Sequence, residues 1–348
     1  MRKKFKIKNT SLLITFILFI ALYALGGFNY ASRNFLTFQN FFNLLKDNAF
    51  LIIASVGTTF VLIMGGIDIS IASNLALTGM LTAFWLDKGV PIYVVLPLTL
   101  GVGSLAGFLM GYMIQEYKVQ PFIATLAGQF FMRGMCSVVS TQSISVRDPA
   151  FTAMSMFKIK LFTELNAKGK VITVSINLAV IIAILVVVVA FFVLKYTKFG
   201  RNIYAIGGNE QSAQLMGLPV KRVKIMVYTL NGFLASLSGI VFTMYTMSGY
   251  NLQNIGMELD AISSSVIGGT LLTGGFGNVI GTFFGVLIQG TIKTIVTYAN
   301  LNTWWTKVTV AGLLCAFVLI QRFAAVREEK RKLETVIPSA PSSEPAKK

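Results

Sequence analysis

Long apolar stretches that carry almost no charge constrain this chain more than any other feature. Of its 348 residues, 55% are apolar and only 12% are charged, whereas soluble domains carry about 25% charged residues. About 20 apolar residues in a helix are enough to cross the roughly 30 Å hydrocarbon core of a bilayer. Because hydrocarbon excludes charge strongly, the sequence predicts an all-α protein that crosses a membrane many times.

Ten candidate spans follow one another along the chain. They cover residues 11–31, 49–67, 71–86, 91–114, 121–140, 171–194, 225–247, 260–273, 276–299 and 305–321. The spans 71–86 and 260–273 are short and rich in Ser, Thr and Gly, which favours shielding by neighbouring helices over exposure to lipid. The first span follows a basic segment, as a signal peptide would. Its length and the lack of a small-residue cleavage site favour a retained helix.

Basic residues lie between the spans and at both ends of the chain. Ten spans place both termini on one side, and that side collects 19 Lys and Arg against 8 on the other. The positive-inside rule therefore predicts cytoplasmic termini, although the outer loop 141–170 opposes it with five basic residues. We expect a basic N-terminus (1–10), a transmembrane domain (11–322) and a disordered cytoplasmic tail (323–348). The net charge of +17 reflects this topology, so no nucleic acid partner is expected.

The residue types exclude several kinds of chemistry. The chain has no histidine, so imidazole metal ligands and His-based catalysis are excluded. Its two cysteines, Cys136 and Cys315, lie in apolar spans and are expected to be free thiols. The GxxxxGK[ST] phosphate loop is absent. We therefore expect no enzyme activity, no metal and no cofactor in this chain.

Glycine recurs every fourth residue in two of the spans. The positions are Gly103, Gly107 and Gly111 in the first and Gly277, Gly281 and Gly285 in the second. Such ridges of small residues let helix backbones approach closely in lipid, so they predict helix packing. Each ridge follows an Asp (Asp68 and Asp260) and a Ser-rich stretch. This pattern indicates a weak internal duplication of the kind seen in many transporters.

One polar stripe falls inside the span 121–140. Thr125, Gln129 and Arg133 are four residues apart and therefore share one helix face. The stripe can line a translocation path. Alternatively, Arg133 is paired within the protein or snorkels to the membrane surface.

A second polar group begins the span 71–86. Asp68 precedes Ser70 and Ser73 in the sequence GGIDISIAS. These side chains can form a gate or part of the path. The alternative is structural, because an Asp just before a helix can satisfy its free backbone N–H groups. Lys307, beside two tryptophans, is interpreted as an anchor at the membrane surface.

The loop 195–224 is the longest connection on the predicted cytoplasmic side. Asn209 is placed to cap a short helix from Glu210 to Met216, which Gly217 would end and Pro219 would keep from continuing. A short helix lying on the cytoplasmic face can dock a partner protein. An ordinary connection is the alternative.

Three segments together resemble a known family. They are GGIDISIASNLALTG from Gly65, TLAGQFFMRGM from Thr125 and ELDAISSSVIGGTLLTGGFGNVIGTFFG from Glu258. The pattern is similar to that of the permeases of ribose-type ABC sugar importers over roughly residues 40–322. Within that family it most resembles one of the two permeases of bacterial galactofuranose importers, a resemblance that extends to YAIGGNEQSAQLMG from Tyr204 and WWTK from Trp304.

The resemblance implies a bacterial inner-membrane assembly. Two permeases would pair with two cytoplasmic ATPases that hold ATP and Mg²⁺, and a periplasmic binding protein would deliver the sugar. The galactofuranose resemblance favours a second permease that is related but not identical. The segment 200–217 would contain the coupling helix that contacts the ATPase. Glu210, Ala213 and Gly217 match the family's coupling pattern, whereas Gln211 and Ser212 depart from it.

Two other classes remain open at this stage. An ion-coupled secondary transporter of a small polar solute would favour a cluster of buried acids, for which Asp68 alone is thin support. A membrane scaffold without transport would tolerate mutation of the polar stripe.

Overall fold

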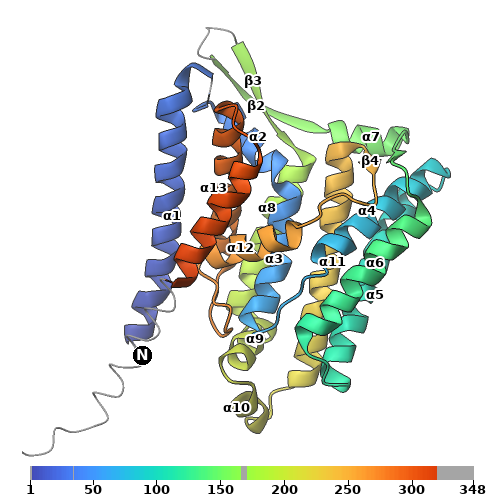
Figure 1. Cartoon of the computed structure of the whole chain (residues 1–348), viewed down its shortest axis with the longest axis vertical. Helices are drawn as coiled ribbons and strands as arrows, with labels where there is room; N and C mark the ends of the chain where they lie inside the picture. The colour runs from blue at the N-terminus through green and yellow to red at the C-terminus, as the bar shows by residue number, and fades with distance from the viewer. Residues whose placement is uncertain (1, 34, 166–170, 320–348) are drawn as a thin grey trace, which may run out of the picture.

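A computed structural model describes residues 2–33, 35–165 and 171–319 of the chain. The structure is mostly helical, and its longest helices run side by side between two ends of the molecule (Figure 1). Within the described residues, six helices are long and apolar enough to cross a membrane. They are α1 (Arg2–Tyr30), α5 (Ile92–Glu116), α6 (Pro121–Val139), α8 (Leu178–Tyr196), α11 (Val220–Thr246) and α13 (Val279–Tyr298).

The shorter helices explain why ten spans are not observed. Helices α2 (Phe38–Asp47) and α3 (Ala49–Ile63) are bent by 56° and count together as a possible seventh span of the described chain. Helix α4 (Ile71–Asp87) is almost entirely buried among other helices. Helix α12 (Met257–Ile267) has 11 residues and rises only about 16 Å. The predicted span 260–273 is therefore this short helix followed by turns, and the span 305–321 is an apolar helix, Trp304–Leu319.

The predicted span 171–194 is wrong at its start. Strand β3 (Val171–Asn177) pairs antiparallel with β2 (Lys158–Leu165), and α8 begins only at Leu178. The sequence VITVSIN is rich in β-branched residues, which favour a strand over a helix. A second short pair joins β1 (Ile144–Ser145) to β4 (Ser248–Gly249). The chain is therefore mostly helical and not all-α.

Glu164 fixes the β2–β3 hairpin to the helices below it. Its two carboxylate oxygens accept hydrogen bonds from the backbone N–H groups of Phe38 and Gln39 at 3.0 and 2.9 Å. Those N–H groups lie in the first turn of α2 and have no partner within the helix. The Gln39 side chain in turn accepts a hydrogen bond from the backbone N–H of Ser175 in β3. The hairpin lies at the upper end in Figure 1.

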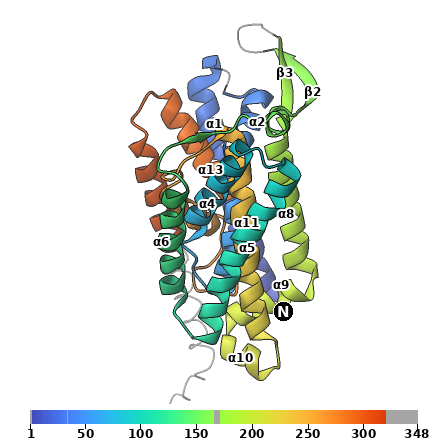
Figure 2. The same cartoon turned by 90° about the vertical axis from the view of Figure 1, so that its right-hand side faces the viewer.

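The first glycine ridge packs α5 against α11, which run side by side in Figure 2. A Cβ atom added at Gly103 would meet Ser236, and one at Gly107 would meet the Tyr228 carbonyl and Gly232. At Gly111 it would meet the backbone of Ile225. These contacts leave no room for larger side chains on this face of α5.

The second glycine ridge lies against α12. Cβ atoms at Gly281 and Gly285 of α13 would meet the carbonyls of Gly268 and Ser264. Gly277 precedes α13 and lies against Ile63 and Thr270. Both ridges therefore face neighbouring segments of the same chain. The internal duplication that they suggested stays a prediction.

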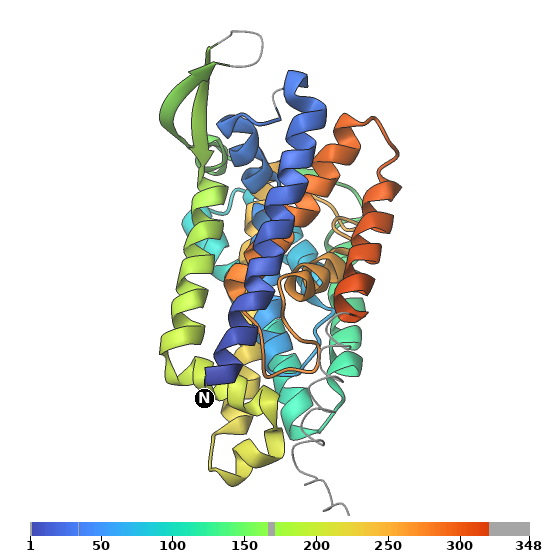
Figure 3. The same ribbon diagram turned by 90° about the vertical axis from the view of Figure 1, so that its left-hand side faces the viewer.

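The remaining elements cover the two ends of the helices. Helix α7 (Pro149–Met156) and the 3-10 helix Ala31–Arg33 lie near the hairpin end, whereas α9 (Lys198–Gly208) and α10 (Glu210–Leu215) form the opposite end (Figure 1). Helix Trp304–Leu319 runs toward the end at which α1 begins (Figure 3). The predicted disordered tail, 323–348, lies outside the described residues.

Candidate translocation path and coupling helix

Asp68 lies in the turn between α3 and α4, and only 2% of its surface is exposed. One carboxylate oxygen accepts hydrogen bonds from the backbone N–H and the hydroxyl of Ser70, at 2.8 and 2.6 Å. The other accepts from the Asn231 amide on α11, at 2.7 Å. The described partners are all neutral, and together they tie the start of α4 to α11. The predicted cap is not formed by Asp68, because the N-cap residue of α4 is Ser70 and Asp68 accepts the N–H of Ser70 and not one from the first turn of the helix.

A polar junction surrounds this carboxylate where α4, α5 and α11 meet. Ser73 donates its hydroxyl to the Ser70 carbonyl at 2.7 Å. The Asn74 amide donates to the carbonyls of Gly103 and Gly232 at 3.2 and 3.4 Å. The Tyr228 hydroxyl and the Asn74 side-chain oxygen are buried without a hydrogen-bond partner among the described atoms.

Asn74, Tyr228 and Asn231 were not singled out from the sequence. Each is a polar side chain inside an otherwise apolar helix, and that signal was present in the sequence. Only the fold shows that Tyr228 and Asn231 approach Asp68 and that Asn74 joins α4 to α5 and α11.

The stripe on α6 faces the interior of the chain along its whole length. Thr125 accepts a hydrogen bond from the Ile69 backbone N–H at 3.4 Å. Gln129 donates to Glu258 at 3.4 Å. Arg133 donates to the carbonyls of residues 251 and 253, at 2.8 and 2.9 Å. The stripe therefore contacts the Asp68 turn at one end and the start of α12 further along. Arg133 holds the turn at residues 251–253 in place.

Helix α12 lies across the long helices at mid-height (Figure 3). Its first turn carries Glu258 and Asp260, and Asp260 forms an ion pair with Lys307 at 2.7 Å. Two apolar residues are exposed here, Ile255 just before α12 (64%) and Leu259 in its first turn (62%). The backbone on both sides of α12 is irregular. At membrane depth such backbone must face protein or water and not lipid.

The Asp260–Lys307 pair was not foreseen, because the two charges are 47 residues apart in the chain. The sequence showed Lys307 beside two tryptophans, which suggested an anchor at the membrane surface.

The predicted short helix is present as α10. The Asn209 side chain caps it by accepting a hydrogen bond from the Ser212 backbone N–H at 2.8 Å, and Gly217 follows with a positive φ of 73°. Ala213 is fully buried, Pro219 directly precedes α11, and Glu210 forms an ion pair with Lys224 at 2.6 Å. The helix therefore has a fixed position on the core.

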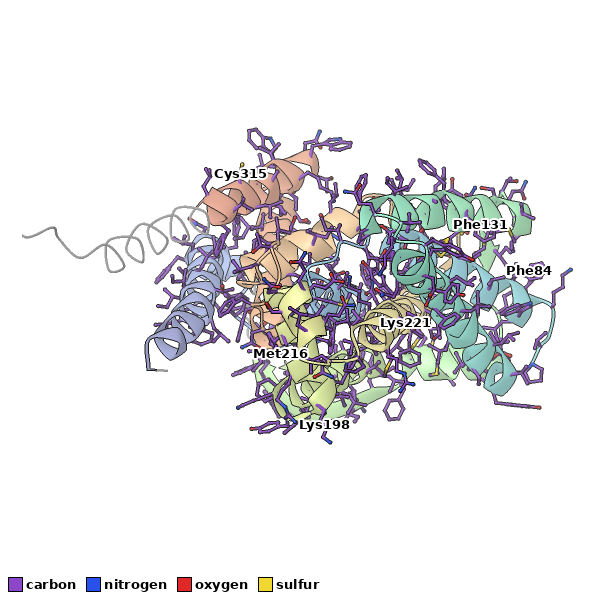
Figure 4. All side chains as sticks on the ribbon, turned by 90° about the horizontal axis from the view of Figure 1, so that it is seen from below. Phe84, Phe131, Lys198, Met216, Lys221 and Cys315 are labelled. Atoms are coloured by element: carbon purple, nitrogen blue, oxygen red, sulfur yellow. The ribbon has the colours of Figure 1, made fainter. Side chains whose placement is uncertain are left out.

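The exposed residues at the end of α10 are apolar. Leu215 and Met216 are 90% and 68% exposed. Figure 4 looks onto this end of the molecule, where Met216 is labelled. Neither side chain was singled out from the sequence, because both fit the buried face of an amphipathic helix equally well.

Helix α9 connects this region to the membrane helices. The Tyr204 hydroxyl donates to the Gly277 carbonyl at 2.8 Å, and burial raises the pKa of Tyr204 to about 12. This hydrogen bond joins α9 to the segment before α13. Gly207 packs against the end of α3 at Ile63 and against the Gly275 backbone. A displacement of α9 would therefore reach α3 and the loop before α13.

These features are those of a multi-pass membrane protein, and the comparisons with known proteins agree with this class. Residues 40–319 match the family model described as the permease component of the branched-chain amino acid transport system. The chain belongs to this family. It is a multi-pass protein of the inner membrane.

Curated relatives include permease proteins of an ABC transporter, of fructose import and of ribose import. The chain is 42% identical to the inner membrane ABC transporter permease protein YjfF of Escherichia coli, over 94% of this chain and 97% of that protein. It is 38% identical to the fructose import permease protein FruG of Bifidobacterium longum (80% and 82% covered). Identity to the ribose import permease protein RbsC of Haemophilus influenzae is 34% (85% and 88% covered). No solved structure matches the chain.

Proposed function

We propose that this chain is the membrane-spanning permease of an ATP-driven importer that carries a monosaccharide into the cell. The observation that carries the proposal is the identity of 34–42%, over most of the chain, to an ABC transporter permease and to permeases for fructose and ribose import. In this role the chain is a non-catalytic subunit. ATP and Mg²⁺ would be held by a separate ATPase.

Helix α10 is the proposed contact to that ATPase. Its exposed Leu215 and Met216 offer an apolar contact, while Asn209, Glu210, Ala213, Gly217 and Pro219 set its shape and position. Through Tyr204 and Gly207, a movement of α10 and α9 would reach α3 and α13. The helix bundles would then rock, and the path would open to the other side.

The proposed path runs along the row formed by Asp68, Ser70, Ser73, Thr125, Gln129 and Arg133 and the start of α12. Because irregular backbone flanks α12, its exposed face needs a protein neighbour or water. A second permease, related but not identical, would pack on this side. A binding protein would deliver the sugar at the hairpin end, and both termini would be cytoplasmic.

Galactofuranose is the sugar we propose. This choice rests on the motif resemblance, whereas the names of the relatives refer to fructose and ribose. Uptake of labelled galactose in its mixed ring forms, competed by ribose, fructose or a galactofuranoside, tests it. Competition by ribose or fructose alone would overturn the choice.

The general proposal is tested by purification and uptake. A tagged chain isolated in mild detergent from its native host should carry a stoichiometric ATPase and a second permease. Sugar uptake should survive collapse of the proton gradient when ATP is maintained. Uptake that stops with the gradient, from a chain purified alone, would instead support an ion-coupled secondary transporter.

A further inference from the structure

A cavity of about 260 Å³ lies where α3, α12, α13 and helix Trp304–Leu319 meet. It faces the half of the molecule that carries the hairpin, because α3 begins there and α13 ends there (Figure 1). The volume is slightly below the roughly 300 Å³ at which small-molecule pockets begin. It therefore suits one small ring and not two.

Two buried polar groups in the cavity wall have no partner. The Asn254 amide nitrogen and the Thr306 hydroxyl are buried without a hydrogen bond among the described atoms. Buried polar groups are nearly always hydrogen-bonded, so each such exception indicates a partner that is missing. Both groups can bind a hydroxyl, the amide as donor and the threonine as donor or acceptor.

Two further amides in the wall are fixed by the protein. The Gln289 side chain is 5% exposed and donates its N–H to the Asp260 carbonyl at 3.1 Å. The Asn48 side chain is 7% exposed and donates to the Leu44 carbonyl at 2.8 Å. Each bond uses a nitrogen and leaves the amide oxygen as an acceptor of known orientation. Fixed acceptors and free donors in one wall are suited to a solute with several hydroxyl groups.

The wall carries one carboxylate, Asp260, and two lysines, of which Lys293 interacts electrostatically with the neighbouring Asp47 carboxylate. Lys307 donates to both carboxylate oxygens of Asp260, at 2.9 and 2.7 Å. The pair still presents N–H and carboxylate groups that strengthen hydrogen bonds to hydroxyls. Phe50 supplies an apolar surface for the C–H face of a ring. These features favour an uncharged polar ring over an ion.

We propose that this cavity is a weak binding site for one uncharged monosaccharide within the permease. The inference rests on the proposed function and adds a location and a set of contacts to it. Asn254, Gln289 and Thr306 would bind the hydroxyls, and the ring would lie against Phe50. Binding must be weak, because a transported solute has to leave the site again.

Tryptophan fluorescence offers a direct test. Two of the three tryptophans, Trp304 and Trp305, directly precede Thr306. In the full-length chain carrying Trp85→Phe, held in lipid nanodiscs, D-galactose or D-ribose should change the fluorescence saturably. D-Glucuronate and maltose should not. Thr306→Val replaces a hydroxyl by a methyl group of similar size and should weaken binding about fivefold, as expected for one hydrogen bond.

Matched variants separate the site from general damage. Glu116→Gln alters an ion pair with Lys221 outside the cavity and should leave the binding curve unchanged. Gln289→Leu removes the acceptor and should bind more weakly than the wild type. If Thr306→Val unfolds, the comparison of Gln289→Leu with the wild type decides. Equal binding by these two would overturn the proposal.

Uptake by cells with the complete importer distinguishes the two proposals. If the wild type imports a sugar but shows no saturable binding, or Thr306→Val binds normally, the cavity proposal is wrong and the permease function stands. If no sugar is imported at all, the proposed function fails.

Discussion

Asp68 is a buried carboxylate whose described hydrogen bonds come from neutral groups, Ser70 and Asn231. Burying a charge is expensive unless hydrogen bonds replace its water. The sequence predicted both a capping and a path role for this residue. Its hydrogen bonds show a structural role, in which Asp68 joins the turn before α4 to α11, and the path role stays a prediction. The contribution of Asn231 could not be predicted, since 163 residues separate the two in the chain.

Replacing Asp68 tests this junction. Asp68→Ala leaves the Asn231 amide and the Ser70 hydroxyl without their acceptor, which should lower the free energy of unfolding by about 1–3 kcal/mol. Thermal unfolding in detergent measures it. Asp68→Ala combined with Asn231→Ala should cost less than the sum of the single changes. Strictly additive losses would show that the two side chains do not interact in the folded protein.

The helices show where sequence patterns succeed and where they fail. Hydrophobicity located α5, α6, α11, α13 and the apolar part of α1 (Leu12–Tyr30) within a few residues, because long apolar runs have few alternatives. Helix α1 itself begins earlier, at Arg2. It misplaced the start of α8, since an apolar β-branched run suits a strand or a helix. It also could not show that α12 ends at Ile267, well before the end of the apolar run. A helix too short to cross a membrane is stable there only when other helices surround it, and that depends on the fold.

Helix α10 could be predicted from local signals alone. Asn209 and Gly217 are cap residues, and caps act within a few positions of the chain. The exposure of Leu215 depends on the packing of Ala213 against the core and was therefore not predictable. The proposed docking role rests on this exposure.

A change at the end of α10 should separate docking from folding. Leu215→Asp is expected to keep the unfolding temperature, because the side chain is 90% exposed. ATPase retention in detergent should fall about tenfold or more, as expected when an interface hot spot is lost. Tyr117→Asp, at an exposed aromatic outside α10, serves as the control. If Leu215→Asp retained the ATPase fully, α10 would not be the main contact.

Two glycines of α5 provide a matched pair for helix packing. Gly107→Ala places a methyl group against Tyr228 and Gly232 and should destabilise the protein by about 1–3 kcal/mol. Gly101→Ala meets nothing within 4 Å and should be neutral or slightly stabilising. Thermal unfolding of both variants in the same detergent makes the comparison. Equal stability would argue against close α5–α11 packing.

At the scale of the whole molecule, the hairpin and α10 lie at opposite ends (Figure 1). The charge count predicts that α10 lies in the cytoplasm, although Lys158 and Lys160 of the hairpin oppose the rule. Charge bias could predict an orientation but not the number of true spans. That number depends on which apolar helices the fold buries.

Surface labelling tests the orientation. In a background with Cys136→Ala and Cys315→Ala, single cysteines are placed at exposed Leu161 of the hairpin and Leu215 of α10. A membrane-impermeant maleimide, applied with the outer membrane permeabilised, should label the first and not the second. Breaking the cells should make both reactive. The opposite pattern would place α10 outside.

The clamp that Glu164 makes on α2 has a mechanical consequence. Glu164 hydrogen-bonds the hairpin to the first turn of α2. Helix α2 is in turn continuous with α3 through the bend at Asn48, because α3 starts at the next residue. Asn48 and Phe50 also belong to the wall of the cavity. A force on the hairpin is therefore transmitted to that wall, unless the Glu164 bonds break or the bend absorbs it. A molecule that binds the β2–β3 hairpin can therefore shift the cavity wall without entering the cavity.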